Sequence, residues 1–489
     1  MRNGGVLLPI FSLPSPYGIG TMGAEARRFV DFLSQAGQRY WQILPICPTA
    51  YGDSPYSSVS TFAGNPYFID LDQLCEEGLL KKKELRDADF TQDGYVHYEE
   101  LYEKRFPLLR AAFARFQQSA PADFVTFCNA QPWLEDYALF AAIKDAEGGK
   151  PWYEWDEPIR RRDKRALRLA KRELAEDIVF WMFVQYLFYR QWDALKTYAN
   201  DKGVYIIGDL PIYVALDSAD VWADPGQFQL DQDLRPTEVA GCPPDAFTAD
   251  GQLWGNPLYD WERMKKNGYA WWMNRIAHQC KIYDVLRIDH FRGFEAYYAI
   301  PYGEDTARNG RWREGPGLDF FRAVERKVGK PQIIAEDLGF LTDGVRRLLD
   351  DTGFPGMKVL EFAFDSREDS DYLPHNYTRR CVVYTGTHDN STVMGWASSA
   401  NPDDVAFAVD YLAMTAKEGL NWGMMRGAWS SVADLAIVQM QDVLGLGDEA
   451  RINTPSTVGL NWRWRMDKKA LTAKLAQKLR HYMELYRRL

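Results

Sequence analysis

The chain alternates between short apolar runs and segments with helical spacing, and this alternation restricts the folds available to it. Eight apolar runs start near Gly5, Tyr40, Val204, Tyr283, Gln332, Met357, Cys381 and Arg451. Helical patterns fall between most of these runs; residues 23–37, for example, carry apolar side chains at helical spacing and end at Gly37. Alternating strands and helices favour a parallel sheet covered by helices. With eight strands we expect an α/β fold, a (β/α)8 TIM barrel.

Two intervals between the expected strands are too long for simple crossovers. Residues 70–201 are rich in charge and in helix formers, which predicts a mainly helical insertion subdomain. Residues 213–261 are rich in Pro, Gly, Asp and Trp, which predicts a loop-rich insertion at the strand-end face, where such sections usually hold substrate. The stretch after the expected eighth strand is short and helical, so we expect no C-terminal β-sandwich. We therefore expect residues 1–489 to form one catalytic barrel.

Three of the apolar runs lead into a carboxylate: Asp289, Glu336 and Asp389. The C-terminal ends of barrel strands are where active sites are built. Two such carboxylates can cleave a glycosidic bond, one as nucleophile and one as acid/base, while a third grips sugar hydroxyls. Any one of them alone fits an ordinary helix N-cap equally well. The three together, with Arg287 and His388 beside two of them, indicate acid chemistry on a neutral, hydroxyl-rich substrate.

The neighbours of these carboxylates suggest separate roles. Arg287 and Asp289 stand two residues apart, so on a strand both side chains face the same side and the guanidinium would keep the carboxylate ionised. Glu336 must instead start protonated, and burial with a nearby negative charge would raise its pKa. Asp209, which ends the third strand, either holds Arg287 or a sugar hydroxyl, or forms a turn before a proline. His388 alone fits a core histidine, but beside Asp389 it favours a hydroxyl-binding pair.

Composition and short motifs argue against several other classes of protein. The net charge of −10 gives a nucleic-acid partner no electrostatic support. No apolar stretch is long enough to span a membrane, and the apolar start is too short for a signal peptide, so we expect a cytoplasmic enzyme. We expect a monomer or a homodimer, and the sequence does not decide between them. There is no phosphate loop, dinucleotide fingerprint, Cys-x-x-Cys or His-Glu-x-x-His pair, so we expect no cofactor and no metal in the catalytic site. A structural Ca2+ held by loop carboxylates is the alternative that the sequence leaves open, because oxygen ligands can be scattered along a chain.

A resemblance to a known family rests on a set of segments spread over the chain. They are Gly52-Asp-Ser-Pro-Tyr-Ser-Ser, Ala63-Gly-Asn-Pro-Tyr-Phe-Ile-Asp, Gly208-Asp-Leu-Pro-Ile-Tyr-Val, Pro243-Pro-Asp-Ala-Phe, Arg287-Ile-Asp-His-Phe-Arg-Gly-Phe, Ile334-Ala-Glu-Asp-Leu-Gly, Tyr384-Thr-Gly-Thr-His-Asp-Asn and Asn461-Trp-Arg-Trp-Arg. This set resembles the α-amylase clan and, more narrowly, the 4-α-glucanotransferases (amylomaltase or disproportionating enzyme, glycoside hydrolase family 77). The α-amylases proper carry a His shortly after the third-strand Asp, whereas here Tyr213 and Val214 follow, as in family 77.

The resemblance implies a role for each strand-end residue. Asp289 would be the nucleophile, Glu336 the acid/base and Asp389 the transition-state stabiliser. Arg287 and His388 would belong to the donor sugar site.

The resemblance also implies the binding surfaces around that centre. Asp209 would line the donor site, and Tyr56 looks like its aromatic stacking platform. Residues 242–254 resemble a flexible lid over the acceptor groove. On this lid Phe247 and Trp254 would either stack on an acceptor sugar or simply pin the loop to the barrel. Phe362 resembles an aromatic of the same groove.

The activity implied is the transfer of segments of 1,4-α-D-glucan to a 4-hydroxyl of an acceptor glucan or glucose, by a retaining double displacement. Maltooligosaccharides and α-1,4-glucans would be the partners of the site. An α-glucan hydrolase would use the same residues and differ only in accepting water, and the residues themselves do not separate the two activities. A catalytically dead glucan-binding protein would be expected to lack one of the carboxylates, and all three are present.

Overall fold

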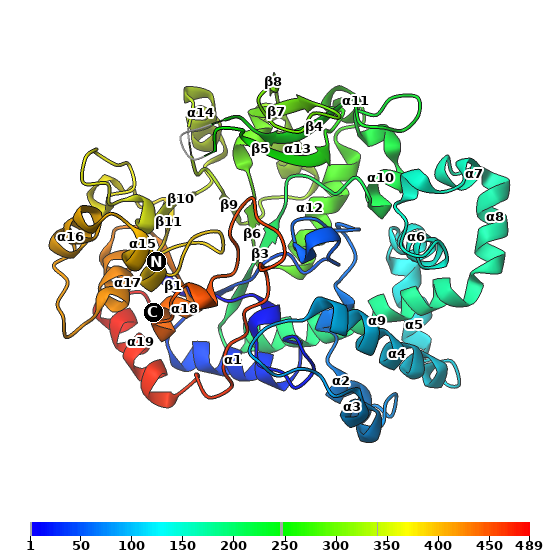
Figure 1. Cartoon of the computed structure of the whole chain (residues 1–489), viewed down its shortest axis with the longest axis horizontal. Coiled ribbons are helices and arrows are strands. Elements are labelled where there is room, and N and C mark those ends of the chain that lie inside the picture. Colours follow the sequence, from blue (N-terminus) through cyan, green and yellow to red (C-terminus); the bar gives the residue numbers. More distant parts are fainter. Residues whose placement is uncertain (1, 245–247, 340) are drawn as a thin grey trace.

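The chain folds into a barrel of eight parallel strands, which confirms the predicted TIM barrel (Figure 1). The computed structural model describes residues 2–244, 248–339 and 341–489. The barrel strands are β1 (Asn3–Leu7), β2 (Tyr40–Gln42), β3 (Tyr205–Leu210), β6 (Val285–Ile288), β9 (Ile333–Ala335), β10 (Gly356–Val359), β11 (Cys381–Tyr384) and β12 (Leu435–Gln439). Most of their residues are buried, as parallel strands covered on both faces require.

Strand order around the barrel is β10-β11-β12-β1-β2-β3-β6-β9. The backbone N–H of Ala335, at the end of β9, donates to the carbonyl of Pro355, just before β10, at 3.0 Å. This bond brings the two outer strands together and nearly closes the ring. Because all strands run the same way, their C-terminal ends gather at one mouth of the barrel.

The predicted position of the eighth strand is wrong. The run near Arg451 is an irregular segment, and the strand is Leu435–Gln439, which pairs with β1 and with β11. This strand is hard to see in the sequence because it lies between the apolar helix α17 and the helix α18, which begins directly at Met440. Residues 451–453 instead pass over the mouth of the barrel, where they contact Asp389.

Helices cover the outside of the barrel. α1 forms over Ala24–Gln35 because its apolar residues recur on one face, where Ala26, Phe29, Val30 and Leu33 are buried. The other helices that follow or precede barrel strands are α9 (Ala175–Asp201), α12 (Ala270–Ile282), α13 (Gly317–Lys327), α14 (Asp343–Thr352), α15 (Val393–Ser399), α16 (Pro402–Tyr411), α17 (Leu420–Ser430), α18 (Met440–Leu444) and α19 (Ala473–Leu485). Short 3-10 helices lie at Ile10–Ser12, Tyr51–Asp53, Pro66–Phe68, Trp152–Glu154, Pro225–Gln227, Phe291–Phe294, Leu360–Phe362, Pro374–Asn376 and Asp448–Ala450.

The interval between β2 and β3 is mainly helical, as its composition predicts. Its helices are α2 (Leu71–Glu76), α3 (Lys82–Ala88), α4 (Tyr98–Phe116), α5 (Ala122–Ala130), α6 (Leu134–Ala146), α7 (Glu157–Arg160) and α8 (Lys164–Glu173). α5–α8 form the cyan lobe at one side of the molecule, the blue helices α2–α4 lie between it and the lower side, and the long helix α9 leads back to the barrel (Figure 1). Whether the lobe is a separate domain stays a prediction.

The interval between β3 and β6 contains strands that the loop interpretation missed. β4 (Glu238–Cys242) and β5 (Gln252–Pro257) form an antiparallel hairpin, after α10 (Ala219–Ala223) and before α11 (Trp261–Lys266). With β7 (Ala296–Pro301) and β8 (Arg311–Glu314) they make a four-stranded sheet in the order β5-β4-β7-β8. Gly and Pro within β4 and β5 hide the strand signal. The predicted lid, residues 242–254, therefore begins at the end of β4 and ends within β5, two strands that pair with each other in this sheet.

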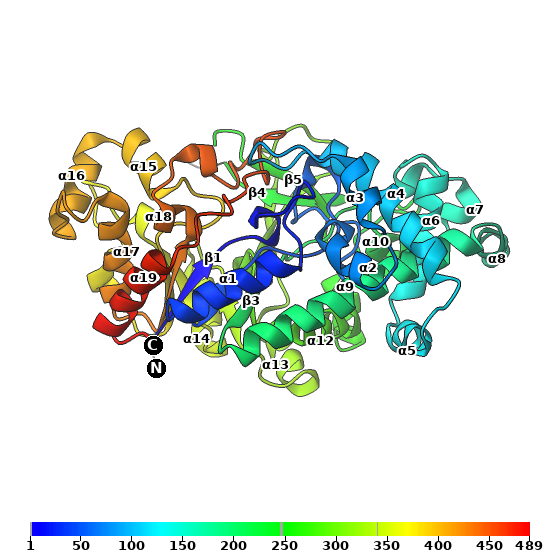
Figure 2. The same cartoon turned by 90° about the horizontal axis from the view of Figure 1, so that it is seen from below.

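The two ends of the chain lie close together (Figure 2). The guanidinium of Arg488 donates to the carbonyl of Asn3 at 3.0 Å, which joins the last helix to the first strand. Within the described residues, no helix combines the length and the apolar character that crossing a membrane requires.

Candidate active site

A buried arginine organises one side of the barrel mouth. Arg287 on β6 lies directly opposite Asp209 on β3 in the strand register, and its Nη1 donates to both carboxylate oxygens of Asp209 at 2.7 Å. The same Nη1 donates to Asp289 Oδ1 at 3.1 Å, so Arg287 and Asp289 do face the same side, as their spacing predicts. Side-chain exposure is 0% for Asp209, 4% for Arg287 and 28% for Asp289. Asp289 is therefore the member of this group that is open to a ligand.

Asp289 and Glu336 occupy matching positions on neighbouring strands. The register pairs Ile288 of β6 with Ala335 of β9, and each carboxylate is the next residue along its strand. Neighbouring strands are about 4.8 Å apart, so the register brings the two carboxylates side by side. The backbone N–H of His290 donates to Glu336 Oε2 at 2.7 Å, and that of Leu338 donates to Oε1 at 2.9 Å. Both oxygens of Glu336 are thus fixed by the backbone.

Asp389 is held from the opposite side of the mouth, after β11. The side-chain amide of Asn453 donates to Asp389 Oδ1 at 2.6 Å, and Arg451 donates to the Asp389 carbonyl at 2.7 Å. His388 Nε2 lies 3.4 Å from Asp389 Oδ2. Asp389 is 45% exposed whereas His388 is buried, so the pair presents a carboxylate to the cleft above a buried imidazole.

Tyr56 links the two sides of the mouth. Its hydroxyl donates to Asp209 Oδ2 at 2.6 Å, and its ring stacks on the His388 ring with centroids 5.1 Å apart and planes inclined by 13°. Trp462 lies against both rings, at centroid distances of 5.9 and 6.0 Å. The structure thus brings the predicted donor-site residues Tyr56, Asp209, Arg287 and His388 into one connected cluster.

Burial dominates the protonation of the two neighbouring carboxylates. Burial raises the pKa of Asp289 well above its usual range; Arg287 lowers it, and Asp209, Glu336 and Asp389 raise it further. Burial also raises the pKa of Glu336, against the lowering effect of Arg287 and of the two backbone N–H groups. The pair therefore retains a proton at a higher pH than isolated carboxyls would.

The expectation that Arg287 alone holds Asp289 ionised needs correction. Arg287 donates to Asp209 through two short bonds and to Asp289 through one longer bond, so much of its charge is already balanced. Burial then outweighs what remains. Positive charge developing on a bound sugar would supply the missing stabilisation of the Asp289 carboxylate. The elevated pKa of Glu336 agrees with the predicted need for a proton donor.

The three aromatic residues predicted for the acceptor side do not form one connected cluster among the described residues. Trp254 on β5 is 37% exposed, and its ring meets the His290 ring edge-to-face with centroids 4.9 Å apart. Phe362 follows β10, is 44% exposed, and contacts Tyr372. Phe247 lies outside the residues that the structure describes. Trp254 is therefore the residue of the predicted lid that the structure places beside His290, next to the predicted catalytic carboxylates Asp289 and Glu336.

Sequence reasoning missed the residues that hold the carboxylates. Asn453 lies 64 positions from Asp389 along the chain, and the segment containing it resembles a strand start. The N–H group that anchors Glu336 belongs to the backbone of His290, so no functional side chain signals it in the sequence. One signal was available: Trp462, which lies against Tyr56 and His388, belongs to the resembling segment that starts at Asn461, shortly after Asn453.

No metal centre accompanies this cluster in the part of the chain that the structure describes. Among those residues, no group of three or more His, Cys, Asp or Glu side chains is arranged to hold a metal ion. The chemistry available to the site is that of carboxylates, a guanidinium, an imidazole and a phenol. Such groups can protonate, attack and hydrogen-bond a polyhydroxylated ligand.

Comparisons with known proteins point to one family. A family model described as 4-alpha-glucanotransferase matches residues 8–472. The 4-alpha-glucanotransferase of Clostridium butyricum is 49% identical over 483 residues, covering 98% of this chain and 99% of its own. That of Thermus thermophilus is 48% identical over 497 residues, covering 99% of each chain. The solved amylomaltase of Streptococcus agalactiae in complex with acarbose has a TM-score of 0.98 at 44% identity, with 100% of both chains covered.

Proposed function

The chain belongs to the 4-alpha-glucanotransferase family, and from this premise we propose that Asp289, Glu336 and Asp389 transfer segments of 1,4-α-D-glucan by double displacement. The observation that carries the proposal is the pairing of Asp289 with Glu336 on neighbouring strand ends. A retaining mechanism uses carboxyl groups about 5–5.5 Å apart, which is close to the spacing of neighbouring strands.

In the first displacement the donor glucan is cut. Asp289 attacks the anomeric carbon of the bound sugar while Glu336 gives its proton to the glycosidic oxygen. The carbon–oxygen bond breaks, the leaving chain departs with that proton, and a glucosyl ester forms on Asp289. Asp389 and His388 hydrogen-bond hydroxyls of the same sugar and stabilise the charge that develops on its ring.

In the second displacement the acceptor is joined. Glu336, now ionised, removes the proton from the 4-hydroxyl of an acceptor glucan or glucose, and that oxygen attacks the anomeric carbon. The ester bond breaks and Asp289 regains its carboxylate. Two inversions at one carbon give net retention, so the product linkage has the configuration of the donor.

The residues around Arg287 form a donor site whose polar groups are already held in place before the sugar binds. Tyr56 offers a ring face for stacking and a hydroxyl fixed by Asp209. Arg287 holds Asp209 and Asp289 in a constant arrangement, so these groups need little reorganisation when the sugar binds. We further propose, from the sequence, a cytoplasmic enzyme that acts as a monomer or homodimer, without a nucleic-acid partner.

Incubation with pure maltotriose tests the proposed activity against hydrolysis. Transfer conserves glycosidic bonds, so maltotriose should become glucose and a ladder of shorter and longer maltooligosaccharides while the number of reducing ends stays nearly constant. Hydrolysis adds one reducing end per event. A rise in reducing ends that matches the loss of maltotriose would favour the hydrolase. The family relationship favours the transferase instead.

A further inference from the structure

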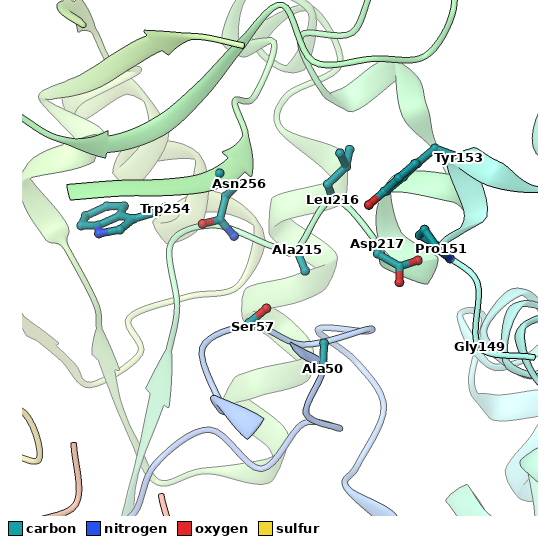
Figure 3. A pocket seen from close by; sticks show the side chains of 11 residues that line it. Ala50, Ser57, Gly149, Pro151, Tyr153, Ala215, Leu216, Asp217, Trp254 and Asn256 are labelled. Carbon is teal, nitrogen blue, oxygen red and sulfur yellow. The ribbon is translucent and has the colours of Figure 1, made fainter. Parts of the chain in front are cut away.

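A cavity of about 490 Å3 lies beside the catalytic cleft (Figure 3). Its volume is within the range of pockets that hold small ligands, about 300–1,000 Å3. Four separate segments line it: residues 50–57 after β2, residues 149–153 of the helical interval, residues 215–217 after β3, and residues 254–256 of β5. The helical lobe and the barrel thus both contribute to one cavity.

Two partly exposed aromatic rings mark the ends of this cavity. Trp254 and Tyr153 are each 37% exposed, and Figure 3 shows them on opposite sides of the lining, with Asn256, Ala215 and Leu216 between them. Aromatic faces bind the apolar faces of sugar rings, and rings held on a folded scaffold lose little entropy on binding. Two such rings, with Asn256 and the small apolar surface of Ala215 and Leu216 between them, suit an extended chain of sugars.

The polar groups of the cavity are fixed by their own hydrogen bonds. Asp217 accepts from Lys144 Nζ at 2.5 Å and from the backbone N–H of Trp152 at 3.2 Å. The side-chain amide of Asn256 donates to the carbonyl of Val214 at 2.8 Å. Because Lys144 balances the charge of Asp217, the cavity offers hydrogen-bonding atoms without a strong net charge. A neutral, hydroxyl-rich ligand fits these conditions.

The cavity shares a wall with the catalytic centre. The Trp254 ring lies edge-to-face on the His290 ring, with centroids 4.9 Å apart. The backbone N–H of His290 donates to Glu336. Ser57, which also lines the cavity, is the residue after Tyr56. Trp254 therefore stands between the cavity and the carboxylate that would activate the acceptor. A chain whose end reaches Glu336 can pass Trp254 and continue into the cavity.

From this arrangement we propose that the cavity is an outer binding site for the acceptor α-1,4-glucan, with Tyr153 as its distal stacking platform. The proposal rests on the proposed function, because it takes Glu336 as the group that activates the acceptor hydroxyl. Tyr153 lies on the side of the cavity away from Trp254 and Glu336, so we expect glucose and maltose to leave it unoccupied and longer acceptors to reach it. Binding there raises the affinity for long acceptors without changing the chemical step.

The test uses acceptors of increasing length that carry a fluorescent label at the reducing end, from glucose to maltoheptaose, with unlabelled starch as donor. Elongation of the label gives KM and kcat for each acceptor. Tyr153→Ala should raise KM for maltoheptaose about tenfold, the effect of one stacking contact, and leave KM for glucose and maltose unchanged. Tyr153→Phe keeps the ring and should retain most of the affinity for maltoheptaose.

Tyr205→Ala is the matched control, because Tyr205 is a half-buried tyrosine at the start of β3, at the opposite end of the barrel. It should leave the dependence on acceptor length unchanged. An equal KM for maltoheptaose in wild type and Tyr153→Ala, or a rise that is the same for every length, would overturn the proposal.

Direct binding separates this proposal from the proposed function. If the wild-type enzyme elongates no acceptor, the proposed function fails. The binding of labelled maltoheptaose, measured by fluorescence polarisation, then still shows whether the cavity binds the glucan. Weaker binding by Tyr153→Ala than by wild type supports the outer site, and equal binding contradicts it.

Discussion

The backbone N–H of His290 donates to Glu336 Oε2 at 2.7 Å, and His290 is the residue directly after Asp289. One peptide unit therefore connects the proposed nucleophile to the group that anchors the proposed acid/base. His290 has a φ of 49°, in the left-handed region that β-branched residues strongly disfavour. The relative position of the two carboxylates thus depends on a strained backbone conformation at one residue.

Two substitutions of His290 test this dependence. Both His290→Asn and His290→Val remove the imidazole, but Asn tolerates the left-handed region whereas Val does not. We expect kcat of His290→Val to be about tenfold below that of His290→Asn, which corresponds to about 1–2 kcal/mol of backbone strain. Equal kcat values in two folded variants would show that this backbone bond does not set the catalytic geometry.

Asn453 should act by positioning Asp389. Loss of a hydrogen bond to a charged group costs about 1.5–3 kcal/mol, so Asn453→Ala should lower kcat about 10- to 100-fold. KM for maltotriose and the Tm should change little, because the proposed role is in the transition state. Asn200→Ala is the control, since Asn200 donates to the carboxylate of Asp284 at 2.9 Å, away from the mouth. Unchanged kcat in Asn453→Ala would exclude this positioning role.

The pH dependence of kcat/KM should reflect the charge of Asp209. The Asp209 carboxylate raises the pKa of Asp289 and occupies Arg287, which would otherwise lower it. Asp209→Asn removes one negative charge and leaves more of the guanidinium charge for Asp289. The pKa of Asp289 should fall, so the acidic limb of the profile should move to lower pH even though the overall rate drops. An acidic limb that stays in place or moves to higher pH would contradict the assignment of that limb to Asp289.

Trp254 should affect the balance between transfer and hydrolysis. Its ring covers His290 beside the catalytic carboxylates, and a covered intermediate meets less water while a bound acceptor gains effective concentration. Trp254→Ala should lower transfer more than hydrolysis, which raises the fraction of events that create a reducing end. Trp254→Phe keeps an aromatic ring and should show a smaller rise. A constant fraction in the folded Ala variant would mean that Trp254 does not govern acceptor choice.

The sequence predicts the parts of this molecule that local patterns determine. Buried strands such as β6 and β11 are mainly apolar runs. A carboxylate that directly follows such a strand lies at the mouth of the barrel, because the strand ends there. The strand over Leu435–Gln439 escapes prediction because apolar helices adjoin it on both sides. The hairpin of β4 and β5 escapes because it depends on pairing with β7, which tertiary structure supplies.

The candidate site likewise contains residues that the local sequence predicts and residues that only the fold brings to it. Asp289, Glu336 and Asp389 carry their own signal, but the groups that hold them come from distant segments or from the backbone. Asn453 contacts Asp389 only because the segment around Arg451 crosses the mouth. The sequence leaves an Asp209–Arg287 pair as one of several alternatives, and only the fold shows the two short bonds that balance the guanidinium, so the direction of the Asp289 pKa could not be predicted from Arg287 alone.

Trapping the covalent intermediate tests the central claim, that Asp289 carries the glucosyl group during transfer. In Glu336→Gln, a maltooligosyl fluoride donor needs no protonation of its leaving group, and the second displacement lacks its base. Mass spectrometry of digested protein should then find the glucosyl adduct on the peptide that contains Asp289, and no adduct in the double variant Asp289→Asn, Glu336→Gln. An adduct on another residue, or near-wild-type turnover by Asp289→Asn alone, would contradict the account.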